Sequence, residues 1–138
     1  MPGAKRDFVT TALITVILIV LVVGTRSVLS TLLKAEVPMA VVSSWSMEPV
    51  LHVGDILVVA GEKSPKIGDV ILFRSPQHGR LVVHRVVNVA PEGYITKGDA
   101  NPVPDFKPVP RRNVVGRVII VIPYLGALRL VIGKILGI

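Results

Sequence analysis

The chain has 138 residues, which is enough for one modest domain but not for several. Hydrophobic residues make up 51% of the sequence and charged residues only 18%, which argues against both a disordered chain and an ordinary soluble globule and favours membrane attachment. The absence of cysteine excludes disulfides, thiolate catalysis and cysteine-ligated metal sites, and the net charge of +7 favours acidic partners, either nucleic acid or anionic lipid.

An apolar segment near the amino terminus predicts a membrane-spanning helix. Residues 8–25 carry no charge, and a weakly polar continuation to Leu33 provides the roughly 20 residues that cross a bilayer. The alternative is a cleavable secretory signal, whose apolar region would be about 7 to 15 residues and would end at a small-x-small site. Neither condition fits well, so we expect residues 1–34 to form an uncleaved anchor. The flanking charges nearly balance and favour a cytoplasmic amino terminus only weakly.

Beyond residue 34, short runs of valine and isoleucine separated by turn-forming residues predict an antiparallel β domain over residues 35–122. The predicted strands are Met39 to Val42, Asp55 to Ala60, Asp69 to Arg74, Leu81 to Val89, Tyr94 to Lys97 and Val114 to Ile122. A proline-rich loop from Gly98 to Arg112 joins the last two strands, and loops beyond about 12 residues are usually functional or disordered. The expected fold class is therefore mainly β, with an N-terminal transmembrane helix and a C-terminal amphipathic helix.

The C-terminal segment, residues 123–138, predicts the amphipathic helix. Arg129 and Lys134 argue against a second membrane span. Helical periodicity gathers one apolar arc, which consists of Leu125, Leu128, Val131, Ile132, Ile135, Leu136 and Ile138. The two charged residues lie opposite with Gly126, Gly133 and Gly137, and with Leu130 among them. The apolar arc either covers the β domain or lies in the bilayer interface, and both interpretations stay open.

Two serines mark the densest cluster of reactive groups, within residues 43–49, where a predicted strand ends and a turn begins. A hydroxyl becomes a nucleophile only when a nearby base takes its proton, and a second hydroxyl can donate a hydrogen bond to the oxyanion that forms. Ser44 and Ser46 share a side if the segment is extended. Taken alone, serines before a proline more often bond to the turn backbone, so a base must lie nearby for this chemistry.

His84 is the candidate base. Strand alternation places it between Val82 and Val86 on one face, and apolar neighbours favour a neutral imidazole that can accept a proton. The alternative is a core histidine with satisfied hydrogen bonds. His52 and His78 fall in predicted turns and lack the ligand spacing of a metal site.

An acid that could orient the histidine is available in the proline-rich loop, which carries Asp99 and Asp105. Glycine and prolines would stiffen this loop, so that one acid could bind the histidine while the other anchors the loop to backbone amides. The alternative is an Asx turn at Asp99 and a solvated Asp105.

A set of motifs follows in order along the chain: Ser44-x-Ser46-Met47-x-Pro49, Gly54-Asp55, Gly68-Asp69-Val70-Ile71, His84-Arg85-Val86, Gly98-Asp99 to Asp105 and Gly116-Arg117-Val118 to Pro123-Tyr124-Leu125-Gly126. In this order the motifs resemble those of type I signal peptidase. The resemblance covers residues 38–126. Because a histidine stands where bacterial members have a lysine base, the chain is similar to the archaeal and endoplasmic-reticulum branch. It departs from the family pattern at Trp45, where glycine is common, and at Ala100, where asparagine is.

The resemblance implies a membrane-bound serine endopeptidase that needs no cofactor. Ser46 would be the nucleophile and His84 the general base, with Asp105 favoured over Asp99 as the electrostatic partner. Ser44 and the Ser46 amide would stabilise the oxyanion. Substrate would lie against two strand edges, and the residues assigned to bind it are Val41, Val42, Val82 and Val83.

The same resemblance implies signal-peptide-bearing preproteins as substrates, a lipid bilayer as the setting and the protein-export channel as a partner. It places the chain in the cell membrane as a single-pass protein, with its catalytic domain on the extracytoplasmic side. Nucleic acid is not expected, because Arg111 and Arg112 form too small a basic cluster and lack interleaved aromatics. Two alternatives are a non-catalytic membrane-anchored β module that presents substrate to a partner, and a self-cleaving protease of the phage-repressor type.

Overall fold

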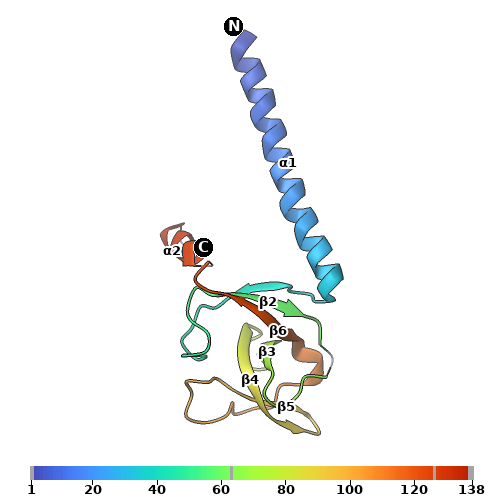
Figure 1. Ribbon diagram of the computed structural model, residues 1–138, viewed down its shortest axis with the longest axis vertical. Coiled ribbons are helices and arrows are strands. Elements are labelled where there is room, and N and C mark those ends of the chain that lie inside the picture. The colour runs from blue at the N-terminus through green and yellow to red at the C-terminus, as the bar shows by residue number, and fades with distance from the viewer. Residues whose placement is uncertain (1, 63, 126, 137–138) are drawn as a thin grey trace. The chain divides into compact units, whose positions relative to one another are not determined.

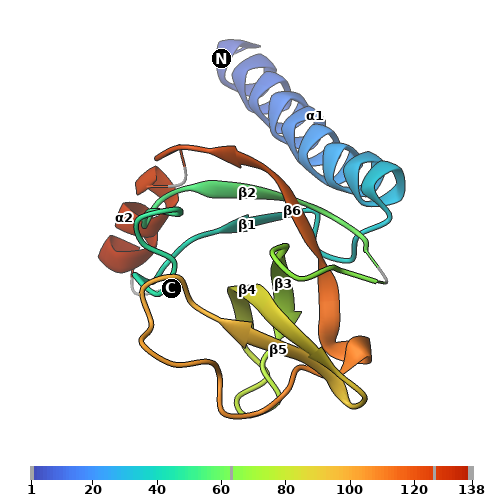
Figure 2. The ribbon, with the colours of Figure 1, turned by 60° about the horizontal axis from the view of Figure 1, so that its bottom comes forward.

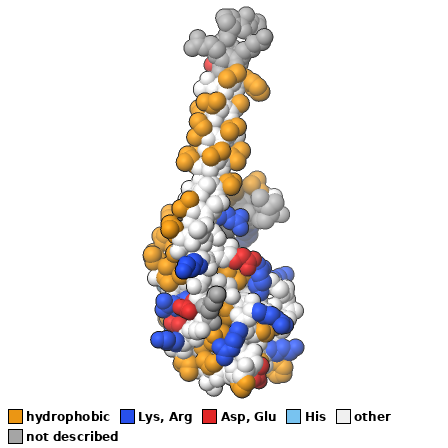
Figure 3. Space-filling model, turned by 90° about the vertical axis from the view of Figure 1, so that its right-hand side faces the viewer, with side chains coloured by type: hydrophobic (Ala, Val, Ile, Leu, Met, Phe, Trp, Pro, Cys, Tyr) orange, Lys and Arg blue, Asp and Glu red, His pale blue; other side chains and the backbone are white. Residues whose placement is uncertain are grey.

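The computed structural model describes residues 2–62, 64–125 and 127–136, and the chain divides into two compact units between Leu32 and Leu33. Helix α1 (Pro2–Leu33) accounts for the first unit. Within the described residues, its stretch Asp7–Leu33 is the one segment long and apolar enough to cross a membrane. Apolar side chains follow the visible face of the helix, whereas lysine, arginine and acidic side chains gather on the second unit (Figure 3).

Three threonine hydroxyls in α1 bond within the helix itself. Thr15, Thr25 and Thr31 each donate to the backbone carbonyl four residues earlier, at 2.9, 2.6 and 2.9 Å. A hydroxyl satisfied in this way needs no partner outside the helix, which is the condition for placing it in lipid.

The second unit is built on a six-stranded antiparallel sheet. Its strands are β1 (Met39–Val41), β2 (Ile56–Ala60), β3 (Val70–Arg74), β4 (Leu81–Ala90), β5 (Gly93–Lys97) and β6 (Val114–Ile122). The strand order is β1-β2-β6-β3-β4-β5 (Figure 1). A short 3-10 helix (Arg111–Asn113) precedes β6, and helix α2 (Ala127–Leu136) follows it.

Strand β6 joins the two halves of the sheet. Its end pairs with β2 and its beginning with β3, and bulges in both ladders bend the sheet at these junctions. Figure 2 shows β1 and β2 on one side of the bend and β3, β4 and β5 on the other. A Cβ atom on Gly116 of β6 would lie 2.2 Å from the Ala60 carbonyl oxygen, so only glycine permits this close approach. The bend brings the β1 edge toward β4.

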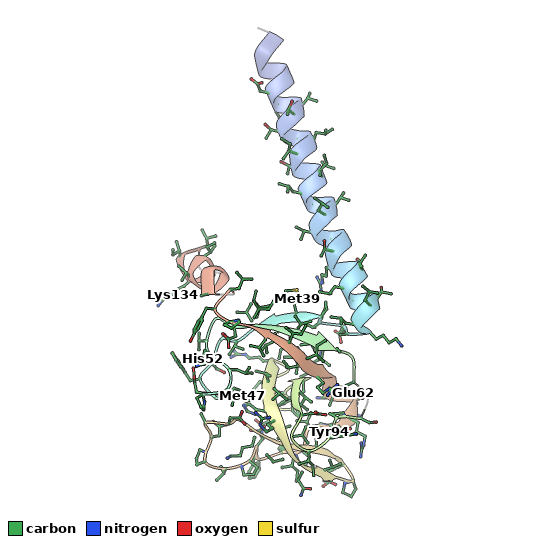
Figure 4. All side chains as sticks on the ribbon, in the orientation of Figure 1. Met39, Met47, His52, Glu62, Tyr94 and Lys134 are labelled. Atoms are coloured by element: carbon green, nitrogen blue, oxygen red, sulfur yellow. The ribbon has the colours of Figure 1, made fainter. Side chains whose placement is uncertain are left out.

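The interior of the sheet holds two apolar clusters of mostly branched side chains, which suit pleated strands. One lies under β1 and β2 and consists of Val42, Met47, Leu51, Leu57, Val59 and Leu72. The other lies under β3, β4 and β5 and consists of Ile71, Phe73, Val86, Tyr94 and Val109. Figure 4 shows Met47 and Tyr94 at these two positions. Met47 of the first cluster directly follows Ser46, and Phe73 of the second cluster packs against His84.

The fold class predicted from the sequence is confirmed, and each predicted strand is found with ends that differ by at most one residue. The predicted start of the C-terminal helix is wrong, because the helix begins at Ala127 and not at residue 123. The preceding residues form a turn in which Tyr124 has a φ of 53° and its amide donates to Oδ1 of Asp55 at 3.0 Å. Gly126, Gly137 and Ile138 of the predicted helix lie outside the described residues.

Candidate active site

Ser46 lies in the turn that follows β1, and this turn is held from two sides. Below it, Met47 and Leu51 are buried in the core. Above it, the Ala100 amide donates to the Ser46 carbonyl oxygen at 2.9 Å. Trp45 and Val50 of the same turn are exposed, at 70% and 52%. The backbone of Ser46 is therefore fixed by the core and by the proline-rich loop together.

His84 presents its imidazole to this serine from the middle of β4. The residue is 8% exposed, and the ring of Phe73 meets it edge-on with centroids 6.1 Å apart. Its Nε2 atom lies 3.2 Å from Oγ of Ser46. Two residues 38 positions apart in sequence thus meet within hydrogen-bond distance.

Asp105 lies on the other side of the imidazole. Its Oδ2 atom is 2.7 Å from Nδ1 of His84 and accepts a hydrogen bond from the Thr96 hydroxyl at 2.6 Å. An ionised carboxylate can only accept, so Nδ1 of His84 carries the hydrogen. In a neutral ring this leaves Nε2 as the acceptor for the Ser46 hydroxyl. The three groups form a continuous hydrogen-bonded line.

The environment of Asp105 favours its charged form. Burial raises the pKa of this carboxyl, but the hydrogen bonds from His84 and Thr96 and the charge of His84 outweigh burial, so the pKa lies below its ordinary value. The carboxylate is therefore ionised at neutral pH, as the hydrogen-bond directions above require.

Asp99 is bound elsewhere, by Arg85. The guanidinium donates from Nε to Oδ1 at 2.9 Å and from Nη2 to Oδ2 at 2.7 Å, and its Nη1 atom donates to the Gly68 carbonyl oxygen at 2.8 Å. The hydrogen bond to Asp99 raises the pKa of Arg85, burial opposes this rise, and the charge of Asp99 adds to it. The sequence-based expectation that the second acid anchors the loop through backbone amides is wrong, because a guanidinium on β4 binds it in bidentate fashion.

Ser44 lies beside the candidate nucleophile, with the two hydroxyl oxygens 3.3 Å apart. Since the Ser46 proton is directed to His84, Ser44 is the donor in this pair. Within the described residues, the Ser46 amide has no acceptor. A hydroxyl and an amide are thus both available beside Ser46 for a developing negative charge.

A groove of about 400 Å³ lies between β1 and the first half of β4 and extends to Ser44. Its lining residues are Val37, Met39 to Ser44, Leu57, Leu72 and Leu81 to Val83, which include all four residues predicted to bind substrate. Strand β1 is at the edge of the sheet, and β5 pairs with β4 only from Arg85 onward. Backbone groups along both sides of the groove are therefore free of a ladder partner within the described residues.

Sequence reasoning missed Thr96, which is fully buried and contacts Asp105 twice, through its hydroxyl and through its carbonyl oxygen at 2.8 Å from the Asp105 amide. A signal was present, because strand alternation places Thr96 on the face of the buried Tyr94, and a buried hydroxyl needs a partner. The role of Arg85 in binding Asp99 was also missed, although the residue belongs to a motif noted above.

Comparison with known proteins gives matches over most of the chain. The model of the protein family described as "Signal peptidase, peptidase S26" matches residues 8–100, a range that includes Ser46 and His84 but not Asp105. The signal peptidase complex catalytic subunit SEC11C of Homo sapiens is 32% identical over 111 residues, which cover 70% of this chain and 58% of that protein.

SEC11C of Mus musculus gives the same values, and the signal peptidase complex catalytic subunit SEC11 of Candida tropicalis is 30% identical over 119 residues, which cover 77% of this chain and 72% of that protein. The chain therefore spans less than two thirds of the length of the mammalian relatives.

Proposed function

This chain belongs to the signal peptidase family, peptidase S26, and from that membership we propose that it is a membrane-bound serine endopeptidase that removes signal peptides from exported preproteins. The observation that carries the proposal is the 3.2 Å contact between Oγ of Ser46 and Nε2 of His84, continued to Asp105 at 2.7 Å. A nucleophile, a base and a group that orients the base are the three parts that hydroxyl nucleophiles require.

In the acylation step, Oγ of Ser46 attacks the carbonyl carbon of the scissile peptide bond while its proton passes to Nε2 of His84. Asp105 stabilises the imidazolium that results. The oxyanion receives hydrogen bonds from the Ser44 hydroxyl and the Ser46 amide. The C–N bond then breaks as Nε2 returns the proton to the leaving amine, which is the new amino terminus of the mature protein, and the signal peptide stays bound to Ser46 as an ester.

In the deacylation step, water replaces the departed amine. The water oxygen attacks the ester carbon while His84 takes one proton from the water. The same proton passes to Oγ of Ser46 as the ester bond breaks. The products are a signal peptide with a free carboxylate and a regenerated Ser46.

The groove supports an extended substrate. A peptide lying between β1 and the first half of β4 can pair with free backbone groups on both strands, and this pairing supplies affinity without reading sequence. Its apolar walls, including Val41, Val42, Val82 and Val83, contact the side chains of the substrate. Its lining includes the buried Val42, Leu57 and Leu72, and we expect small apolar side chains next to the scissile bond.

Helix α1 supports the proposed setting. We place residues 1–34 in the cell membrane as a retained single-pass anchor, residues 35–122 on the extracytoplasmic side as the catalytic domain, and residues 123–138 as a C-terminal amphipathic segment. Confinement of enzyme and preprotein to one bilayer raises their effective concentration. A histidine in the place of the base supports our proposal that the chain is of the archaeal and endoplasmic-reticulum type, and we propose preproteins, lipid and the protein-export channel as its partners.

The alternative is a non-catalytic anchored module that presents substrate to a partner, which would need no hydrogen-bonded line from Ser46 to Asp105. The test is to reconstitute the purified full chain alone in lipid vesicles with a preprotein and to analyse the products by mass spectrometry. A protease yields a mature protein and a signal peptide from one cut. A presenting module yields only intact preprotein, which would refute the proposal.

A further inference from the structure

Helix α2 exposes an apolar face that no other described part of the chain covers. Val131, Ile132, Ile135 and Leu136 are exposed at 54%, 45%, 76% and 63%. At about 100° per residue, these four lie within one arc of about 140°, which we call the α2 apolar face. The turn before the helix adds Tyr124 and Leu125, exposed at 59% and 65%.

The opposite side of α2 meets the β unit. Ala127 and Gly133 are half-buried, and a Cβ atom on Gly54 would lie 3.1 Å from Cβ of Ala127. On the helical wheel these two residues flank the side opposite the centre of the α2 apolar face. Of the two orientations that the sequence left open, the helix does not turn this face onto the β domain.

The start of α2 is fixed to the loop that carries Ser46. Asp55, which is 2% exposed, accepts hydrogen bonds from the His52 amide at 2.8 Å and the Tyr124 amide at 3.0 Å, and the rings of His52 and Tyr124 pack 5.6 Å apart. Figure 4 shows His52 in this loop. A surface that binds α2 would therefore also set the position of Ser46.

The charge of α2 selects among possible occupants. The helix contains no aspartate or glutamate, and its charged residues are Arg129 and Lys134. An apolar helix face combined with uniformly positive charge complements a bilayer surface that contains anionic lipid. Only residues 34–38 separate α1 from β1, a distance of at most about 20 Å at roughly 3.5 Å per residue, so a spanning α1 keeps the β unit at the bilayer.

We propose that α2 lies in the interface of an anionic bilayer, with Val131, Ile132, Ile135 and Leu136 in the acyl-chain boundary and Lys134 among the head groups. Together with α1, this second contact holds the β unit in one orientation, and the junction at Asp55 transmits that orientation to the turn of Ser46. The proposal concerns placement and does not require that Ser46 be catalytic.

The absence of cysteine permits a direct test, because a single introduced cysteine takes a nitroxide label at one position. The full chain carrying Ile135→Cys is labelled and reconstituted in vesicles of phosphatidylcholine with phosphatidylglycerol, and Lys134→Cys is the matched control on the adjacent residue. Electron paramagnetic resonance then measures collisions of each label with oxygen, which partitions into lipid, and with a water-soluble nickel chelate. Circular dichroism checks that both labelled chains keep the secondary structure of the parent.

The proposal predicts that the ratio of oxygen to nickel collisions is several-fold higher at position 135 than at position 134, and that the contrast decreases in vesicles of phosphatidylcholine alone. High nickel access at both positions would show that α2 stands in water and would overturn the proposal. Shielding of position 135 from both reagents would overturn it as well, because it would show that a second copy of the chain covers this face.

Discussion

The hydroxyl of Thr96 lies 2.6 Å from Oδ2 of Asp105, the same oxygen that accepts the hydrogen bond from Nδ1 of His84. One carboxylate oxygen therefore binds the candidate base and a fully buried hydroxyl on β5. A rotation of the carboxylate away from His84 would break both bonds and leave the Thr96 hydroxyl buried without a partner. We therefore expect Thr96 to act as a positioning residue through Asp105.

Replacing Thr96 with valine keeps the shape of the side chain and removes this bond. We expect Thr96→Val to lower kcat about tenfold or more with little change in KM, because a hydrogen bond to a charged group is worth about 1.5 to 3 kcal/mol. Thr96→Ser, which keeps the hydroxyl, should restore most of the rate. Steady-state cleavage of a fluorogenic signal-peptide substrate measures both constants. Equal kcat values for the valine and serine variants would contradict a positioning role.

Substitutions of Asp99 and Asp105 should have different effects on activity and stability. Asp105→Asn places an amide beside Nδ1 of His84 and removes the charge that stabilises the imidazolium, so we expect kcat to fall by a factor of about 10³ or more with a modest fall in melting temperature. Asp99→Asn breaks the bidentate pair with Arg85 and should lower the melting temperature more than Asp105→Asn does. Cleavage assays and thermal melts of both variants check this. The reverse pattern would reassign the electrostatic partner to Asp99.

The lowered pKa of Asp105 predicts a pH dependence of stability. Since this carboxyl titrates lower in the folded than in the unfolded state, its stabilising contribution is fully present above the unfolded pKa of about 3.9 and is lost as pH falls through the folded pKa. The melting temperatures of the wild type and Asp105→Asn should therefore differ by a constant amount from neutral pH to about pH 5 and converge below pH 4. A gap that widens in acid would contradict the assigned direction.

Gly98 lies so close to Ser46 and His84 that a methyl group at this position should displace them. A Cβ atom would stand 2.5 Å from the Ser46 carbonyl oxygen and 3.0 Å from Nε2 of His84. Gly98→Ala should therefore lower kcat at least as much as Thr96→Val does, because a small displacement of catalytic groups lowers the reaction rate steeply. The matched control is Gly24→Ala in α1, where nothing lies within 4 Å of the added atom. Equal activity in both variants would show that the contact is not tight.

Local patterns along the chain were enough to predict the N-terminal apolar helix, all six strands and the burial of His84. Alternation reports which face of a strand a residue occupies, and it placed His84 on an inward face without reference to any partner. The ordered motifs then selected Ser46 from three nearby serines.

The sequence could not assign the contacts made by Asp99 and Asp105. The two acids lie six residues apart in one irregular loop, and only the path of that loop past β4 and β5 decides that Arg85 binds the first and His84 the second. The start of α2 was misplaced for a similar reason, since the bond from the Tyr124 amide to Asp55 joins residues 69 positions apart. Such contacts depend on tertiary distance, which local patterns do not contain.

The most direct test is the substitution Ser46→Ala, which removes the hydroxyl oxygen of Ser46. The full chain and its Ser46→Ala variant are reconstituted in identical vesicles with the same preprotein, and the mature protein is quantified over time by mass spectrometry. We expect one cleavage site for the wild type and a rate lower by a factor of about 10³ or more for the variant, which lacks the hydroxyl that lies 3.2 Å from His84. Cleavage by Ser46→Ala at the wild-type rate and position would contradict this expectation.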